Sequence, residues 1–306
     1  MTVAERGTPP PERVAAVIVT HHPDATLDQT VAAALDQVDR LWIVDNGSGS
    51  DVIAHLSRLR DTNPDRIELT FNEQNSGLPA AQNLAIAAAL DVGYDWILLL
   101  DDDSVPEPGM VATMLRAVAS RPDPSRVALV APRLFDLNLN RFRKMYLSRH
   151  AWHVARLDCT HDRDDLVYAI ASGSLIRADA MRAVGPLRED FFIDYVDIEY
   201  ALRLRRAGHR LLLAADTQIN HKLGEAQQSN ILGQARTFNS HATWRRYLIY
   251  RNRLRVWRAY GASFPAFILA DAASAIFGMI HAGLFEQARF AQLGAMSKGI
   301  WDGLRG

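Results

Sequence analysis

The stretch Trp96-Ile97-Leu98-Leu99-Leu100-Asp101-Asp102-Asp103 decides the fold class of this 306-residue chain. An apolar run that stops at clustered acids is typical of a buried parallel strand whose carboxyl end opens into a ligand-binding cleft. Because three neighbouring carboxylates repel one another, we expect a cation among them, and oxygen ligands suit Mg²⁺ or Mn²⁺. A solvated acidic turn is the simpler explanation of this stretch taken alone.

Predicted strands and helices alternate along the chain. Short apolar runs predict strands at residues 14–20, 41–44, 67–71, 96–100, 127–131 and 166–176. Apolar residues at helical spacing predict helices within residues 27–38, 52–59, 84–89 and 177–184. The alternation indicates an α/β fold, with a mostly parallel sheet, right-handed crossovers and helices on its faces.

The composition is that of an ordinary globular protein, with 48% hydrophobic and 23% charged residues. The net charge is −1, so bulk electrostatics give no argument for a nucleic-acid partner and we expect none. The single cysteine, Cys159, excludes an intramolecular disulfide and fits a reducing, cytoplasmic compartment. Residues 1–12 lack an apolar core, so we expect a short tail there and no signal peptide.

Polar residues follow the first, second and third predicted strands. Thr20 ends the first strand, and no Gly-x-Gly-x-x-Gly follows it, which argues against a dinucleotide-binding domain. Asp45-Asn46-Gly47-Ser48 ends the second strand, and the run from Asn75 to Asn83 follows the third. Taken alone, each of these two segments has a composition that is ordinary for a turn. Together with the acidic triplet they outline one crevice of nucleotide size at the carboxyl edge of the sheet.

A second acidic cluster contains Asp194, Asp197 and Glu199, and aromatic residues flank it. Helical spacing begins at Asp197, so favourable interaction with the helix dipole is one explanation for these acids. They also suit a site that removes a proton from a sugar hydroxyl while packing against the sugar ring.

The region from Thr243 to the end predicts long helices, the first rich in aromatic residues and arginine. A helical cap with its arginines in water is one explanation, and contact with anionic lipid or a diphosphate is another. The apolar stretch 264–285 contains Pro265, Asp271 and His281, whose cost argues against a membrane-spanning helix. Peripheral contact with a membrane surface stays open.

Six motifs in order are together highly specific. They are Val-Ile-Val-Thr (17–20), Val-Asp-Asn-Gly-Ser (44–48), Asn-x-Gly-x-x-x-x-x-Asn (75–83), Leu-Asp-x-Asp-Ser (100–104), Ser-Gly-Ser (172–174) and Asp-x-Val-Asp-x-Glu-x-x-x-Arg (194–203). This order resembles glycosyltransferase family 2, and within it the rhamnosyltransferase branch. The match covers residues 14–224 and continues more loosely to about residue 300.

The resemblance implies a GT-A domain over residues 13–240, a helical region over 241–306, and sugar transfer from a nucleotide donor with inversion. It implies these donor-site residues: Thr20, Asp45, Asn75, Gly77, Asn83 and Asp101. It makes Asp103 a ligand of Mg²⁺ or Mn²⁺, with Asp101 binding the ribose or a metal-bound water. Asp102 occupies a position where relatives often carry an uncharged residue, so we interpret it as a bystander.

By the same resemblance, Asp197 is the base, and Asp194 or Glu199 orients the acceptor or an arginine. His221 is expected on the metal or diphosphate, although a lone histidine is more often structural. Arg251 could neutralise phosphate, but an arginine on a helix surface is the simpler explanation.

The resemblance also implies a donor and an acceptor. The expected donor is dTDP-L-rhamnose, and the expected acceptor is a cell-surface glycan or a polyprenyl-linked precursor at the inner face of the cell membrane. Alternatives are UDP-galactofuranose or UDP-GlcNAc as donor, and a non-catalytic carbohydrate- or nucleotide-binding relative that has lost the base. A nucleotidyltransferase should show a glycine- and lysine-rich phosphate loop near its first strand, which this sequence lacks. Assembly into a homo-oligomer stays open.

Overall fold

A computed structural model describes residues 12–158, 160–221, 225–231, 234–240, 242–286 and 288–306. The strands are β1 (Val14–Thr20), β2 (Arg40–Asn46), β3 (Ile67–Asn72), β4 (Trp96–Asp101), β5 (Val105–Pro106), β6 (Val127–Asp136), β7 (Arg141–Phe142), β8 (Met145–Leu147), β9 (Ala155–Leu157), β10 (Leu175–Arg177), β11 (Arg210–His221), β12 (Glu225–Ile231) and β13 (Gln234–Ser240). The α-helices are α1 (Thr26–Leu35), α2 (Ser50–Thr62), α3 (Leu78–Val92), α4 (Met110–Ala119), α5 (Ala178–Val184), α6 (Val196–Arg206), α7 (Thr243–Tyr260), α8 (Pro265–Phe285) and α9 (Arg289–Arg305). Cys159 and almost all of the predicted N-terminal tail lie outside the described residues.

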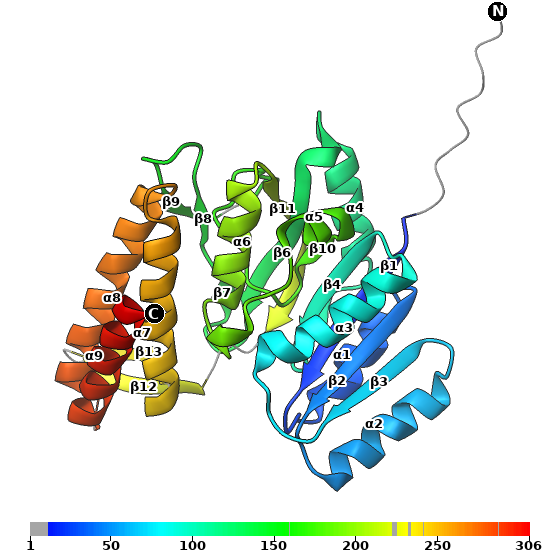
Figure 1. Ribbon diagram of the computed structural model, residues 1–306, viewed down its shortest axis with the longest axis horizontal. Helices are drawn as coiled ribbons and strands as arrows, with labels where there is room; N and C mark the ends of the chain where they lie inside the picture. The colour runs from blue at the N-terminus through cyan, green and yellow to red at the C-terminus, as the bar shows by residue number, and fades with distance from the viewer. Residues whose placement is uncertain (1–11, 159, 222–224, 232–233, 241, 287) are drawn as a thin grey trace, which may run out of the picture.

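The central sheet has the strand order β3-β2-β1-β4-β10-β6-β11-β5, with β7 paired to β6. Strands β1 to β4 are parallel, and the short strand β10 is antiparallel between β4 and β6. Helices α1, α2 and α4 cover one face of the sheet, and α3, α5 and α6 cover the other (Figure 1). Because β1 is covered on both faces, all seven of its residues are buried, which explains its unbroken apolar sequence. The predicted α/β class is confirmed.

The predicted strand at residues 166–176 is wrong for most of its length. Only residues 175–177 form a ladder strand, β10, while one isolated bridge at Leu166, irregular backbone and a turn occupy the part before it. The turn contains Gly173 at φ 83°, a left-handed conformation that a strand residue cannot take. The turn crosses the end of β4, where the Ser172 hydroxyl accepts a hydrogen bond from the Asp101 N–H at 3.0 Å. A serine-rich turn therefore supports the acidic triplet.

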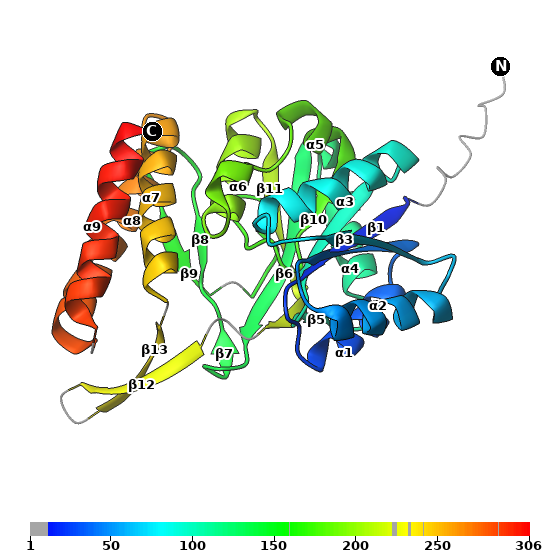
Figure 2. The ribbon, with the colours of Figure 1, turned by 60° about the horizontal axis from the view of Figure 1, so that its bottom comes forward.

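The C-terminal helices α7, α8 and α9 lie together at the end of the molecule opposite β3 (Figure 1). Helix α9 lies very close to α7 because Gly299 and Gly303 face the α7 backbone, where a side chain would collide with the carbonyls of Tyr247 and Arg251. The hairpin of β12 and β13 links the sheet to these helices (Figure 2). The long helices predicted for this region are present.

Candidate active site

A cleft of about 1070 Å³ opens at the carboxyl ends of β1, β2 and β4, and the starts of α6 and α7 complete its walls. It is lined by the acids Asp101, Asp102, Asp103, Asp194 and Asp197, by His21, His221 and Arg245, by the amides Asn46, Asn75 and Gln82, and by the aromatic residues Tyr168, Phe192, Tyr195, Tyr200 and Trp244. The carboxyl edge of a parallel sheet is where ligands bind in such folds.

Asp101, Asp103 and His221 form a compact cluster in this cleft. His221 Nδ1 lies 3.2 Å from a carboxylate oxygen of Asp103, and His221 Nε2 lies 3.7 Å from one of Asp101. One ligand atom of each residue lies within 4.8 Å of the other two, close enough for all three to bind a single ion. Asp101 ends β4 and His221 ends β11, so the cluster joins residues 120 positions apart in the sequence.

Burial and like charge change how the residues of this cluster titrate. Burial raises the pKa of Asp101, an effect that His221 opposes. Burial lowers the pKa of His221, but its hydrogen bond to Asp103 and the charge of Asp101 outweigh this, and the pKa is raised. Asp102, interpreted above as a bystander, also lines the cleft, and burial and the neighbouring acids raise its pKa to about 7. The raised pKa values of Asp101 and Asp102 reflect the cost of holding several buried carboxylates together, a cost that a bound cation would lower.

Thr20 and Asp45 form a buried pair behind the cleft. The Thr20 hydroxyl donates to Asp45 Oδ1 at 2.9 Å, and the Ser48 N–H donates to Asp45 Oδ2 at 3.0 Å. Both Thr20 and Asp45 are almost completely buried, and neither is among the residues that line the cleft. In this structure they fix the strand ends from which a ligand would be contacted.

Asn46 holds the 72–77 loop, which forms one wall of the cleft. Its Oδ1 accepts hydrogen bonds at 3.0 Å from the Asn72 side chain and from both the N–H and the hydroxyl of Ser76. Its Nδ2 donates to Asn75 Oδ1 at 3.0 Å and to the Gly77 carbonyl at 3.3 Å. Asn75 lines the cleft, so the buried amide of Asn46 fixes a side chain that faces the ligand space.

Gly77 and Asn83 connect this loop to the opposite wall. Gly77 has φ 90°, and a Cβ there would lie 2.8 Å from the Phe192 ring, so only glycine fits. Asn83 lies farther along α3, where its amide donates to the Leu187 carbonyl and to Glu189 and accepts from the Leu187 N–H. Asn83 thus ties two parts of the protein together and is not among the cleft-lining residues.

The 191–197 segment forms the opposite wall and is conformationally strained. Phe192, Asp194 and Tyr195 all have positive φ, at 66°, 60° and 65°. Non-glycine residues adopt this region at a cost, and such strain persists only where the surroundings enforce it. Asp197 lies in the first turn of α6, directly after this segment.

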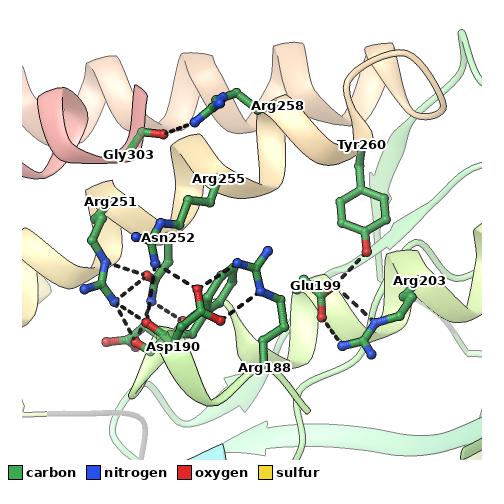
Figure 3. A network of polar contacts seen from close by, with 12 residues as sticks. Arg188, Asp190, Glu199, Arg203, Arg251, Asn252, Arg255, Arg258, Tyr260 and Gly303 are labelled. Carbon is green, nitrogen blue, oxygen red and sulfur yellow. Dashed lines mark hydrogen bonds and ion pairs between the residues drawn. The ribbon is translucent and has the colours of Figure 1, made fainter. Parts of the chain in front are cut away.

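Asn252 of α7 holds the strained 191–197 segment in its conformation. Its side chain is fully buried, and its Nδ2 lies 2.9, 2.9 and 3.0 Å from the carbonyl oxygens of Phe191, Ile193 and Asp194. The neighbouring Arg251 donates to the carbonyl of Asp190 (Figure 3) and to that of Phe191, and it is not among the cleft-lining residues. The Arg251-Asn252 pair therefore acts on the backbone of the 191–197 segment.

The two acids of this segment have different surroundings. Asp194 accepts two hydrogen bonds from Arg245, at 2.8 and 3.0 Å, so its charge is paired. Asp197 accepts a hydrogen bond from the Ile198 N–H, but burial together with Asp194 and Asp101 raises its pKa to about 6. A carboxylate with such a pKa is able to accept a proton near neutral pH.

Glu199 differs from both, because it points away from the cleft. It is buried, its two oxygens accept hydrogen bonds from Arg203, and Tyr260 donates a further one at 2.6 Å (Figure 3). The structure thus brings together Asp101, Asp103, His221, Asn75, Asp194 and Asp197 around one cleft. It places Thr20, Asp45, Gly77, Asn83, Glu199 and Arg251 behind its walls.

Sequence reasoning missed three cleft-lining residues with clear chemistry. Arg245 is one of the C-terminal helix arginines for which the sequence leaves water, anionic lipid and a diphosphate open, no sequence motif points to Trp244, and Tyr168 lies inside the incorrect strand. Trp244 is 55% exposed at the mouth of the cleft and packs edge-on against Phe192. No local motif marks these residues. The return of α7 to the sheet brings Trp244 and Arg245 to the site, and the irregular stretch before β10 brings Tyr168 there.

The strand order and the acidic cleft at the carboxyl edge define a GT-A glycosyltransferase fold. The family model described as glycosyl transferase family 2 matches residues 15–185, more than half of the chain. The chain therefore belongs to glycosyltransferase family 2, as the motifs had indicated.

Two curated relatives and one solved structure illustrate the similarity. The chain is 23% identical to the dTDP-rhamnosyl transferase RfbF of Shigella flexneri over 95% of both chains. It is 29% identical to the galactofuranosyltransferase GlfT1 of Mycolicibacterium smegmatis over 79% of this chain and 82% of the other. Its fold is similar to that of the mannosyltransferase PcManGT from Pyrobaculum calidifontis in complex with GDP-Man and Mn²⁺, with a TM-score of 0.57, 14% identity, and 96% and 75% of the two chains covered.

Proposed function

We propose that this glycosyltransferase moves a sugar from a nucleotide donor to a hydroxyl group with inversion of configuration, and that it needs a divalent metal ion. The observation that carries this proposal is the placement of two unlike acidic groups in one cleft. The Asp101, Asp103 and His221 cluster suits an ion, while Asp197, with its raised pKa, suits a base. A base facing an electrophilic stabiliser is the equipment for displacing a diphosphate by an alcohol.

Asp101, Asp103 and His221 would hold the ion. Carboxylates suit Mg²⁺ and Mn²⁺ alike, but an imidazole ligand favours a transition metal, so the donor set fits Mn²⁺ better. When bound, the ion supplies positive charge that stabilises the departing nucleoside diphosphate.

The protein residues then have distinct roles. Asp197 accepts the proton of the acceptor hydroxyl, and Asp194 keeps Arg245 directed into the cleft. Asn75 contacts the nucleoside, and the Thr20–Asp45 pair keeps the strand ends in place beneath it. A single displacement of this kind inverts the anomeric configuration. Gly77, Asn83, Glu199 and Arg251 support the two walls without touching substrate.

The donor we propose is dTDP-L-rhamnose. Support comes from the dTDP-rhamnosyl transferase RfbF, whose similarity to this chain extends over 95% of both chains. A second candidate, UDP-galactofuranose, is favoured by the higher identity of 29% to GlfT1 over a shorter stretch. The acceptor is a sugar hydroxyl of a cell-surface glycan or its polyprenyl-linked precursor, glycosylated on the cytoplasmic side of the membrane.

The test is to incubate the purified full-length protein with each donor, with Mn²⁺, with Mg²⁺ and with excess chelator, and to follow nucleoside diphosphate release. We expect release from dTDP-L-rhamnose that depends on the ion. Release from UDP-galactofuranose alone would select the second donor. Equal release with and without chelator would refute the metal-dependent mechanism, and release from no nucleotide sugar would favour a non-catalytic relative.

A further inference from the structure

The arginines of α7 are mostly not available to bind an external partner. Arg245 pairs with Asp194, Arg246 with Glu286, Arg253 with Asp271 and Arg255 with Asp190. Arg246 and Arg253 are each only 9% exposed. Carboxylates of the protein therefore pair the charge of these four residues, and Arg245 in addition lines the cleft, as the expected contact with a diphosphate requires.

Helix α8 presents an apolar outer face instead. By length and composition it is the one helix in the described part of the chain that could cross a membrane. Its exposed large side chains recur at helical spacing and are Leu269, Ile276, Phe277, Ile280, Leu284 and Phe285, exposed by 45% to 67%. No charged residue of α8 shares this exposure. A continuous exposed face made of several large apolar side chains marks an interaction site.

The polar residues expected to interrupt α8 lie on its other side. Pro265 is the first residue of the helix, where proline is tolerated. Asp271 faces α7, where it accepts hydrogen bonds from Arg253, from the Trp257 indole at 2.8 Å and from the Tyr195 hydroxyl at 2.8 Å. A spanning α8 would have to leave α7 and expose this buried network, so α8 is better suited to lie on a surface.

Helix α9 adds positive charge beside this face, and α8 and α9 are in contact (Figure 2). Its exposed apolar residues are Phe290, Trp301 and Leu304. Arg289 stacks on Phe290, and the Arg305 guanidinium lies 3.9 Å from the Trp301 ring centre.

The carboxylates of this region are all paired within the protein. Asp271 and Glu286 pair with Arg253 and Arg246 of α7. Asp302 accepts a hydrogen bond from Tyr247 of α7 and pairs with the exposed Lys298 of its own helix, so among the described residues Arg289 and Arg305 are the α9 cations without a salt bridge. The outer surface of α8 and α9 is consequently apolar and cationic.

We propose that the outer surface of α8 and α9 binds an anionic phospholipid bilayer. Apolar side chains would enter the boundary between headgroups and acyl chains, and Arg289 and Arg305 would contact anionic headgroups. A second copy of the chain fits less well, because a twofold interface would bring like charges of the two α9 helices together. Through Asp271 and Tyr195, α8 also contacts the 191–197 segment, so the docked helix and the cleft form one connected unit.

The experiment is co-sedimentation of the full-length protein with vesicles of phosphatidylcholine alone and of phosphatidylcholine mixed with phosphatidylglycerol. We expect binding to the mixed vesicles that weakens as salt rises. The double variant Phe277→Glu/Ile280→Glu should lose at least about tenfold in binding, because two charges would enter the apolar layer. Arg289→Glu/Arg305→Glu should lose the preference for anionic vesicles.

The matched control is Leu84→Glu, which places a glutamate at a half-exposed leucine of α3, on the sheet domain. It should bind vesicles like the unaltered protein, and circular dichroism should show every variant folded. Equal sedimentation of the unaltered protein and the Phe277→Glu/Ile280→Glu variant would overturn the proposal. So would a dimer in gel filtration that this variant dissociates, because a second copy would then cover the face.

Discussion

The two walls of the cleft are each held by one buried asparagine, but from different parts of the fold. Asn46, at the end of β2, holds the 72–77 loop, whose residues follow it by 26 to 31 positions within the same sheet. Asn252, on α7, holds the 191–197 segment from 58 to 61 positions away. We call the 72–77 loop the amide wall and the 191–197 segment the acid wall. The position of the amide wall thus depends on the sheet, and that of the acid wall depends on the C-terminal helices. Nucleotide affinity and turnover should therefore respond to different substitutions.

The largest effect is expected at the acid wall itself. Asp197→Asn removes the proposed base without changing its size, so kcat should fall by about 10²–10⁴-fold, the usual contribution of general base catalysis. Nucleotide affinity, measured by calorimetry, should stay the same because Asp197 lies on the other wall from Asn75. An unchanged kcat would remove Asp197 from the mechanism.

The second largest effect is expected for the Asn252→Asp variant. The carboxylate has the shape of the amide but offers no N–H to the three carbonyls, so the strained 191–197 segment should relax and displace Asp197. A misplacement of about 1 Å lowers rates by about 10²-fold, and we expect that loss in kcat with nucleotide affinity preserved. A matching loss of nucleotide affinity would show that the two walls are not separately held. Thermal unfolding serves as the control for global destabilisation.

The pKa of Asp197 predicts how kcat depends on pH. Burial raises the pKa of Asp197 to about 6, and its carboxylate form is the one that accepts a proton. At saturating donor and metal, kcat should fall about tenfold for each pH unit below the pKa that Asp197 has in the loaded enzyme. Asp102, whose pKa is about 7, is another carboxylate of the cleft that titrates in this range. If Asp197 is the base, the fall of kcat at low pH, the acidic limb of the profile, should remain in Asp102→Asn. If the acidic limb of the pH profile disappears in Asp102→Asn, the group that causes it is Asp102 and not Asp197.

The smallest effect is expected at the amide wall. Asn46→Asp removes the donor to Asn75 and Gly77, which should loosen the 72–77 loop. The loss of one buried hydrogen-bonding group costs about 1–3 kcal/mol, so nucleotide Kd should rise about tenfold. Under saturating donor, kcat should change far less than in Asn252→Asp. Calorimetry and steady-state kinetics on both variants test the contrast directly.

Much of the sheet domain was readable from sequence because its signals are local. The runs ending at Thr20, Asn46 and Asp101 lie on strands buried on both faces, and each strand end places a polar residue at the same edge. The motif order alone indicated family 2. The 166–176 stretch was misassigned because apolarity does not distinguish a strand from a buried turn that contains a left-handed glycine.

The sequence by itself therefore determined the α/β class, the family and the acids that could carry chemistry, since each depends on residue types at short spacing. Only the tertiary structure decided which of those acids face the cleft. Asp194, Asp197 and Glu199 share one motif, yet Arg245 pairs the first, burial shifts the second, and Arg203 and Tyr260 hold the third behind the wall. Likewise, four of the α7 arginines, Arg245, Arg246, Arg253 and Arg255, take their direction from carboxylates up to 65 positions away. Partners that distant in the chain leave no periodic trace in the sequence, because packing alone brings them together.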